Sequence, residues 1–209
     1  DANARGSQFY IVNADTGAPI WWASSTSSIG TTPHLTVADM KFSIPGEPKL
    51  FDANKDGLVD AVYFGDLGGQ VFRLDLNNAN TAASGLVPRV HRLANVGQLE
   101  GTANEANQRR FYETPSVALM FDSASSSEYV AVAIGSGSRS RPLDSDTEDA
   151  FFVFRDGDVL RADLATAASD SLQATITRSE MAQLNLSSPL GATISTTQKG
   201  WWVDFVNSG

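Results

Sequence analysis

Three aspartates and one asparagine alternate along residues 52–60, which read Asp-Ala-Asn-Lys-Asp-Gly-Leu-Val-Asp. Calcium is a hard cation that takes about six to eight oxygen ligands, and a short loop can supply them from alternate positions. Gly57 allows the sharp turn that such a loop needs, because glycine readily adopts positive φ. The sequence therefore predicts a Ca²⁺ site within one short connection. Its expected ligands are Asp52, Asn54, Asp56, the carbonyl of Leu58, and Asp60.

The residues around this loop distinguish it from an EF-hand. Tyr63 stands at the twelfth position, where an EF-hand carries a bidentate glutamate. The flanking residues alternate as in strands rather than helices. Asp, Asn and Gly also dominate ordinary turns, so a polar turn without metal is the alternative interpretation.

An internal repeat allows the loop to be compared with a second connection in the chain, which helps to decide between a metal site and a polar turn without metal. Leu50-Phe51-Asp52 is echoed by Met120-Phe121-Asp122, and Phe64-Gly65 by Ile134-Gly135, at the same offset of 70 positions. At this offset Asp52 keeps an aspartate, whereas the other side-chain ligands correspond to alanine, serine and valine at positions 124, 126 and 130. The second connection is expected to form without those carboxylates, so a metal is the better explanation for them.

Short segments of period two lie around the loop and along the chain. They are rich in β-branched and aromatic residues and are predicted to be strands. They cover residues 9–12, 49–51, 61–64, 71–74, 129–134 and 151–154. Glycine-containing turns at residues 15–17, 67–69 and 156–157 favour antiparallel hairpins. Repeated units of this kind predict an all-β fold, a modified β-propeller or part of one built of antiparallel blades.

The remaining segments are expected to be loops with one short helix. Residues 77–110 and 163–176 are predicted to be long rim loops, apart from a strand-like segment at 89–93. Thr177 and Glu180 have the spacing of a capping box, which predicts a helical turn or two over 177–184.

Composition narrows the range of partners. The 209 residues carry a net charge of −9, which disfavours nucleic acid and anionic membranes as partners. No cysteine is present, so disulfides and thiolate chemistry are excluded. No apolar stretch is long enough to cross a membrane, so we expect no membrane insertion. The sequence opens without methionine and is interpreted as a fragment of a longer protein.

Other polar and aromatic groups receive structural interpretations. The acidic residues 144, 146, 148 and 149 lie beside Arg139 and Arg141 and are expected to form local ion pairs, with a second cation site as the alternative. The pairs 21–22 and 201–202, all tryptophan, are expected to pack in the core, with a ligand platform as the alternative. His34 and His91 are isolated. Arg73 and Asp75 share one face of a strand, and Asp66 is expected to cap a hairpin.

The motifs resemble those of a known family. Asp52-Ala-Asn-Lys-Asp-Gly-Leu-Val-Asp-Ala-Val-Tyr-Phe-Gly-Asp-Leu-Gly-Gly-Gln-Val-Phe-Arg-Leu-Asp-Leu76 resembles the signature of the PilY/PilC family of type IV pilus biogenesis proteins. Residues 134–143 followed by 149–156 resemble a second family stretch, and 200–204 a third. The resemblance implies that residues 1–209 are a C-terminal β-propeller domain fragment. The large N-terminal region of such proteins and an Arg-Gly-Asp sequence are absent.

The resemblance also implies a function. It predicts a calcium-binding module that supports pilus assembly, the balance of extension and retraction, adhesion and twitching motility. The expected partners are pilins or minor pilins and a host surface ligand. The expected location is exported, at the pilus tip, cell surface, or outer membrane or periplasm of a Gram-negative bacterium.

Two other functions are kept as alternatives. Related propellers hold pyrroloquinoline quinone with calcium as a Lewis acid, but that chemistry needs a central funnel with a stacking aromatic and a base. Here the ligands come from one hairpin loop, and no nucleophile elbow, P-loop or dinucleotide fingerprint is present, so we predict that the chain is not an enzyme. A carbohydrate-binding adhesin that uses the tryptophan pairs is the other alternative.

Overall fold

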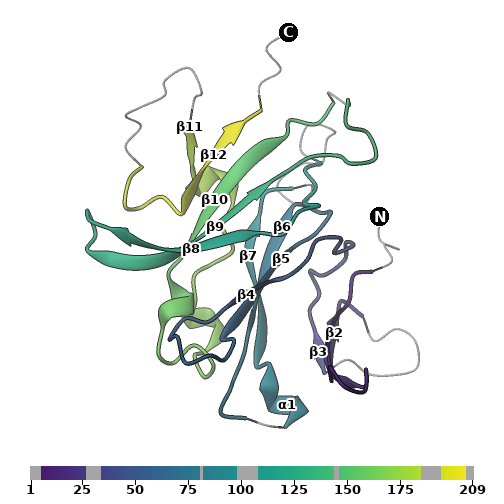
Figure 1. Ribbon diagram of the computed structural model, residues 1–209. Helices are drawn as coiled ribbons and strands as arrows, with labels where there is room; N and C mark the ends of the chain where they lie inside the picture. Colours follow the sequence, from purple (N-terminus) through teal and green to yellow (C-terminus); the bar gives the residue numbers. More distant parts are fainter. Residues whose placement is uncertain are drawn as a thin grey trace.

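The computed structural model describes residues 6–26, 34–80, 82–97, 108–143, 146–184 and 194–205, and all structural statements below concern these residues. They form three sheets that follow one another along the chain (Figure 1). Nearly all regular structure is strand, as the alternating pattern predicts. The all-β class and the antiparallel blades are thus confirmed.

The middle sheet is a four-stranded antiparallel meander that contains the predicted metal loop. Its strands, in both chain and spatial order, are β4 (Lys49–Phe51), β5 (Ala61–Gly65), β6 (Gln70–Asp75) and β7 (Arg89–Asn95). Their β-branched and aromatic residues suit a pleated surface, and the predicted metal loop joins β4 to β5 while a short turn joins β5 to β6. The strand predicted within the loop 77–110 is β7, which extends two residues further than predicted.

The second unit is a five-stranded sheet in the order β11-β12-β10-β9-β8. Its strands are β8 (Ser116–Asp122), β9 (Ser127–Gly135), β10 (Ala150–Asp156), β11 (Ala182–Leu184) and β12 (Gly200–Asp204). All pairs are antiparallel except β11 with β12. The strands β8, β9 and β10 repeat the succession of β4, β5 and β6.

The N-terminal sheet is the smallest. It contains β1 (Phe9–Val12), β2 (Pro19–Ser24) and the two-residue β3 (Leu35–Thr36). The β1–β2 pair is antiparallel and β2–β3 is parallel.

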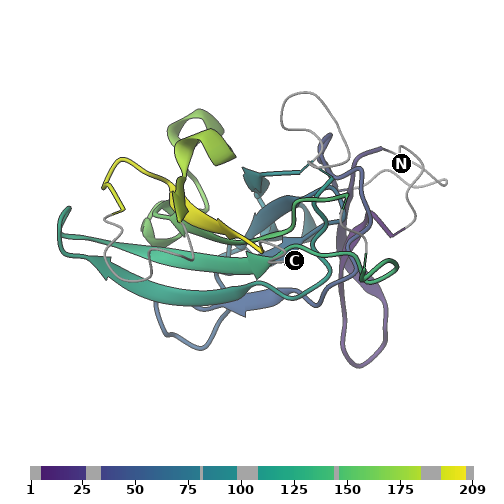
Figure 2. The same ribbon diagram turned by 90° about the horizontal axis from the view of Figure 1, so that it is seen from above.

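The middle sheet is covered on both faces. Ala61 and Tyr63 of β5 pack into a cluster with Val132 and Phe152 of the five-stranded sheet. The intervening residues of β5 belong to a second cluster that includes Trp21 of β2. Because successive side chains of a strand point to opposite faces, β5 is buried on both sides. The three sheets therefore succeed one another as blades packed by their faces (Figure 2).

A buried ionic network joins the middle and five-stranded sheets. Arg73 Nε donates to Asp75 Oδ1 at 2.6 Å, and its Nη1 donates to Asp156 Oδ1 at 2.6 Å. The Tyr63 hydroxyl donates to Asp156 Oδ2 at 2.9 Å. All three charged side chains of these ion pairs are fully buried. Burial alone would lower the pKa of Arg73, but the carboxylates of Asp156 and Asp75 outweigh that effect and raise it.

The predicted contact of Arg73 with Asp75 is thus confirmed, and Asp156 is an addition that bridges two sheets. Burial and the adjacent Asp156 carboxylate raise the pKa of Tyr63 well above its ordinary value. Burial and the nearby Arg73 guanidinium lower the pKa of His91 on the neighbouring strand. Fully paired buried charges of this kind are costly to break, so loss of one partner is expected to destabilise the contact between the two sheets.

Helical structure is limited to short turns. Within the described residues the α-helix is α1 (Ala83–Leu86), and the 3₁₀ turns are η2 (Asp158–Leu160), η3 (Ser169–Ser171) and η4 (Arg178–Glu180). The capping box at Thr177 and Glu180 is present. The helix predicted over 177–184 is nevertheless wrong beyond residue 180, because 182–184 pair as β11 with β12. None of the helices in the described segments has the length and hydrophobicity needed to cross a membrane.

Candidate metal centre

The predicted metal loop is the connection between β4 and β5. Phe51, the last residue of β4, pairs with Ala61, the first residue of β5, and the Asp60 amide donates to the Phe51 carbonyl at 2.9 Å. The loop is therefore closed at its base by the hairpin, and all five predicted ligands lie on it. In Figure 1 it extends beyond the end of β4, beside the helical turns that follow β10.

The first aspartate organises the beginning of the loop. The amide of Lys55 donates to Asp52 Oδ1 at 2.6 Å, and the amide of Gly57 donates to Asp52 Oδ2 at 2.9 Å. The chain reaches this conformation through positive φ at both residues, 64° at Lys55 and 90° at Gly57. Glycine takes such a φ without strain, as the sequence predicted for position 57.

The next two predicted ligands also turn towards the backbone. Asn54 Oδ1 accepts from the Asp56 amide at 2.9 Å, and Asp56 Oδ1 accepts from the Leu58 amide at 2.8 Å. Their side chains contact each other, since Asn54 Nδ2 donates to Asp56 Oδ2 at 3.1 Å. The loop is therefore wrapped so that alternate side chains lie on its inner side.

The last predicted side-chain ligand closes the loop. Asp60 Oδ2 accepts from the amide of Ala53 at 2.8 Å and from that of Asn54 at 3.3 Å. Its other oxygen accepts from Asn78 Nδ2 at 3.2 Å, and the same Asn78 group donates to the Val59 carbonyl at 3.1 Å. Asn78 was not predicted from the sequence. The β5–β6 register, in which Ala61 pairs with Asp75, would have placed residue 78 beside the loop.

The chemistry of this donor set fits a hard cation. Every predicted side-chain donor atom is oxygen, and a carboxylate oxygen that accepts one amide hydrogen bond keeps a further lone pair. Across the described segments, no group of three or more His, Asp or Glu side chains is gathered closely enough to hold a metal by itself. An ion here would therefore also need the Asn54 side-chain oxygen and the Leu58 carbonyl oxygen. Both belong to the set of ligands predicted from the sequence.

The metal loop forms one wall of a cavity of about 520 Å³. Asn54, Asp56 and Asp60 line it from the loop, and Leu160, Arg161 and other residues of 159–165 line it from the segment after β10. Arg161 is held by Asp163, with Nε to Oδ1 at 2.9 Å, and this ion pair lowers the pKa of Asp163. The cavity contains both charged and apolar groups, and the conformation of the loop determines the shape of one side.

The equivalent connection of the second unit is shorter than the repeat predicted. Phe51 pairs with Ala61, ten positions further on, whereas Phe121 pairs with Glu128, seven positions further on. Val130 therefore lies inside β9 opposite Leu119, and it is not the structural counterpart of Asp60. The offset of 70 holds at the end of the first strand and at Gly135, but not within the loop.

The other predicted constellations have structural roles. Trp21, Trp22 and Trp202 are buried, which confirms core packing for these residues, and Trp201 is half-buried. Arg139 forms its ion pair with Glu113 rather than with the acidic cluster, of which residue 144 lies outside the described residues.

The predicted hairpin cap is confirmed. Asp66 Oδ1 accepts from the amides of Gly68 and Gln70 at 2.9 and 3.0 Å. Burial raises the pKa of this carboxyl group to about 7, against the opposing effect of hydrogen bonds from Gln70 and Gly68. The Asp66 side chain is fully buried, so it fixes the β5–β6 turn at the end of the sheet away from the metal loop.

The fold and the loop together define an all-β protein of packed antiparallel sheets with an oxygen-rich hairpin connection. No family model matches the chain. No curated protein matches it in sequence.

A solved structure has the same fold. The crystal structure of the Pseudomonas aeruginosa PilY1 C-terminal domain matches with a TM-score of 0.62 and 18% sequence identity. The match covers 100% of this chain and 46% of that chain, so this chain spans less than half the length of that domain's chain. The resemblance predicted from the motifs is thereby confirmed at the level of the fold.

Proposed function

We propose that this chain is a calcium-binding module of a protein related to the type IV pilus. The observation that carries the proposal is the loop 52–60, where alternate oxygen side chains wrap inward from a closed hairpin. The fold shared with the PilY1 C-terminal domain supports the relation to the pilus. The family motifs in the sequence support it independently, because they were identified from residue order alone.

The proposed effect of calcium is to stabilise the conformation of the loop. Asp52, Asp56 and Asp60 place three negative charges on one short loop, and a bound divalent cation would offset part of that charge. The loop forms a wall of the 520 Å³ cavity, so binding would also fix the shape of that cavity. A ligand shifts a conformational equilibrium only by its differential affinity, so the effect on a partner is limited by the free energy of calcium binding.

The cellular role that we propose follows the family. The module would act in an exported protein at the pilus tip, cell surface or outer membrane, and its partners would be pilins or minor pilins. Support for pilus assembly, the balance of extension and retraction, adhesion to a host ligand and twitching motility are parts of this proposal. A binding role is proposed in preference to catalysis, because the candidate ligands belong to one continuous connection.

The direct test is thermal unfolding of the purified chain in calcium and in chelator. Wild type is expected to melt at higher temperature in calcium, with about 2.7 kcal/mol of stabilisation when free calcium is 100 times the Kd. Asp56→Ala is expected to lose this response. Asp56→Asn keeps an acceptor for the Leu58 amide but removes one charge, and is expected to weaken calcium binding without changing stability in chelator.

The chain offers a matched control in its second hairpin. Asp122→Ala removes an aspartate at the equivalent strand end and should leave the calcium response intact, even if stability falls in both conditions. Equal melting of wild type in millimolar calcium and in chelator would contradict the proposal. In the native bacterium, Asp56→Ala at normal protein level is expected to reduce piliation or twitching, and unchanged motility would contradict the pilus role.

A further inference from the structure

A second cavity lies in a different region from the metal loop. It has a volume of about 340 Å³ and is lined by Gln108, Arg110, Tyr112, Ser140, Arg141, Asp146 and Thr147. Two arginines and one aspartate give this lining a formal charge of +1, in a chain whose net charge is −9. The connection between β9 and β10, which contributes Ser140 and Arg141, lies at the opposite end of the sheets from loop 52–60 (Figures 1 and 2).

The arginines are brought together from two segments that are fastened to each other. Arg110 lies before β8, and its carbonyl accepts from the Gly137 amide of the β9–β10 connection at 3.1 Å. The next residue, Phe111, is fully buried, and its amide donates to the Asp66 carbonyl at 3.0 Å. Phe111 packs closely against Gly65, where an added Cβ would lie 2.9 Å from the Phe111 Cβ. The position of Arg110 is therefore fixed by the core.

The connection that carries Arg141 is held at both ends. Arg139 Nε donates to Glu113 Oε1 at 3.1 Å, which ties the connection to the segment that contains Arg110. The Ser136 hydroxyl donates to Asp149 Oδ1 at 2.8 Å and accepts from the Ala150 amide at 2.9 Å. These contacts position the Gly- and Ser-rich stretch 135–140, which has no part in the candidate metal site.

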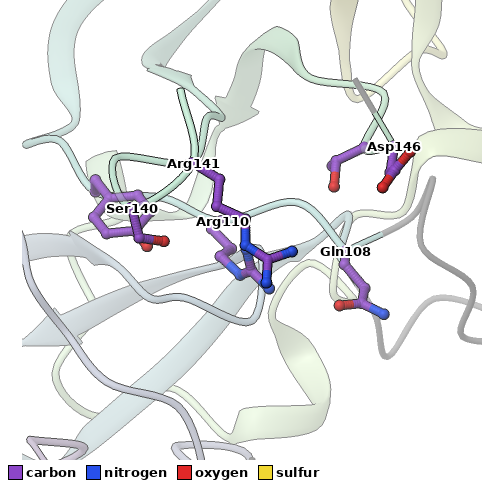
Figure 3. A pocket seen from close by; sticks show the side chains of 7 residues that line it. Gln108, Arg110, Ser140, Arg141 and Asp146 are labelled. Carbon is purple, nitrogen blue, oxygen red and sulfur yellow. The ribbon is translucent and has the colours of Figure 1, made fainter. Parts of the chain in front are cut away.

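Figure 3 shows the side chains of Arg110 and Arg141 extending into the pocket, with Gln108 and Asp146 on its other side. Two guanidinium groups and one carboxylate belong to the residues that line this cavity, so the lining carries more positive than negative charge. Arg141 and Asp146 also make contacts within the chain, so an incoming group would add to existing contacts. Guanidinium groups bind carboxylate and phosphate oxygens through paired N–H donors. Tyr112, Ser140 and Thr147 also line this space and carry hydroxyl groups, of which that of Ser140 lies 3.4 Å from Ser138 Oγ, and Thr147 makes a contact within the chain.

We propose that this pocket binds the oxyanion group of a small polar ligand between Arg110 and Arg141. The oxyanion chemistry is common to a carboxylate, as on an acidic sugar, and to a phosphate. The volume accommodates a ligand of a few heavy atoms beyond the anionic group, and the polar wall favours one that carries hydroxyl groups. This site is separate from the calcium loop and does not depend on it.

Calorimetric titration with glucuronate and, separately, with inorganic phosphate tests the proposal and distinguishes the two sources. Wild type is expected to bind at least one probe, with affinity that falls as salt rises. Arg110→Gln and Arg141→Gln are each expected to weaken binding about 10-fold or more, since each removes charge-assisted hydrogen bonds. Lys41→Gln makes the same charge change on an exposed side chain outside the pocket and should bind as wild type.

Arg110→Lys provides a variant that keeps the positive charge and tests geometry. It is expected to bind more weakly than wild type, because lysine lacks the paired donors. Circular dichroism establishes that each variant is folded, and each should retain the melting response to calcium of wild type. Absence of binding of both probes to wild type would overturn the proposal, as would binding that persists in both glutamine variants. Failure of the calcium response alone would contradict the proposed function and leave this site intact.

Discussion

The hairpin connections β4–β5 and β8–β9 occupy the same place in two successive units but are built differently. Both follow an aromatic residue and an aspartate, Phe51-Asp52 in one and Phe121-Asp122 in the other. The first wraps around carboxylates with positive φ at Lys55 and Gly57. The second makes a shorter turn with positive φ at Ser126.

The two aspartates also differ in their counter-charges. Asp122 Oδ1 accepts from the Ala124 amide at 3.0 Å, and Oδ2 forms an ion pair with Arg155 at 3.3 Å. The hydrogen bond from the Ala124 amide lowers the pKa of Asp122, and the positive charge of Arg155 adds to this effect. Within the described segments, Asp52 forms hydrogen bonds to loop amides but no ion pair. The difference indicates that a hairpin at this place needs neither three carboxylates nor nine residues, which is consistent with the cation site proposed for the first loop.

The two units differ in their first connections, β4–β5 and β8–β9, but their third strands, β6 and β10, end alike. The strand β6 ends at Asp75 and β10 ends at Asp156, and Arg73 binds both carboxylates in the interface between the sheets. Repetition of the unit thus supplies two acidic groups; Arg73 pairs with both of them, and Arg89 adds a second positive charge beside Asp75. The structural charges lie inside the interface, and the candidate ligands of the metal lie at its exposed end.

The largest loss of unfolding free energy is expected when Arg73, which pairs with both Asp75 and Asp156, is replaced. Arg73→Met leaves Asp156 buried without its counter-charge and is expected to cost about 3–5 kcal/mol of unfolding free energy, as measured by urea denaturation. The double variant Arg73→Met with Asp156→Met should recover part of the loss, because Asp75 keeps its ion pair with Arg89 at 2.8 Å. A loss below about 1 kcal/mol for the single variant would show that the network does not fix the docking of the sheets.

The second-largest effect is expected in how the unfolding free energy depends on pH, and it distinguishes Asp66 from Ser136. These residues follow Gly65 and Gly135 at the ends of β5 and β9. The pKa of Asp66 is raised to about 7 in the folded chain from an ordinary value of 3.8. Between about pH 4 and 7 the folded chain therefore holds a proton that the unfolded chain lacks. The contribution of Asp66 to stability is greatest below pH 4 and falls as pH rises towards 7, by up to about 1.4 kcal/mol per pH unit.

The measurement is the difference in unfolding free energy between wild type and Asp66→Asn at several pH values. Taking a difference cancels the opposite pH dependence of carboxylates with lowered pKa, such as Asp163. The advantage of wild type over the variant is expected to shrink from pH 4 to 7 and then stay constant. Ser136→Ala, at the equivalent turn, should show no such slope. A difference independent of pH would exclude protonation of Asp66 in the folded chain.

Much of this arrangement follows from local sequence. The alternation around 61–64 predicts a strand, and Asp66 before two glycines predicts a capped turn. The pairing of 182–184 with β12 was missed, because parallel pairing joins segments far apart in sequence and a capping box at 177–180 favours a helix locally. The contact of Arg73 with Asp156 depends on how two sheets dock, which no spacing within one strand specifies. The candidate loop could be identified from the sequence because its predicted ligands lie at alternate positions of one short segment.

The third effect is the change in calcium response expected when the β4–β5 and β8–β9 connections are exchanged. Replacing 52–60 with residues 122–127 should leave stability in chelator nearly unchanged and remove the whole calcium increment, about 2.7 kcal/mol at 100 times the Kd. The reverse graft, with 52–60 in place of 122–127, should add a calcium response in the second unit. Isothermal titration of both chimaeras gives the number of sites. A calcium response that survives the first exchange would move the site elsewhere in the chain.

The smallest effect is expected from Arg155→Gln, which removes the arginine that pairs with Asp122. Both side chains are partly exposed, so the melting temperature is expected to fall by about 2 °C or less. Arg155 also lies over the Tyr129 ring at 4.9 Å, and Arg155→Lys keeps the charge as a control for lost packing. Neither variant should bind calcium in the second hairpin, because one freed aspartate supplies too few oxygens. Calcium binding at this hairpin after Arg155→Gln would mean that the arginine, rather than the missing carboxylates, distinguishes the two connections.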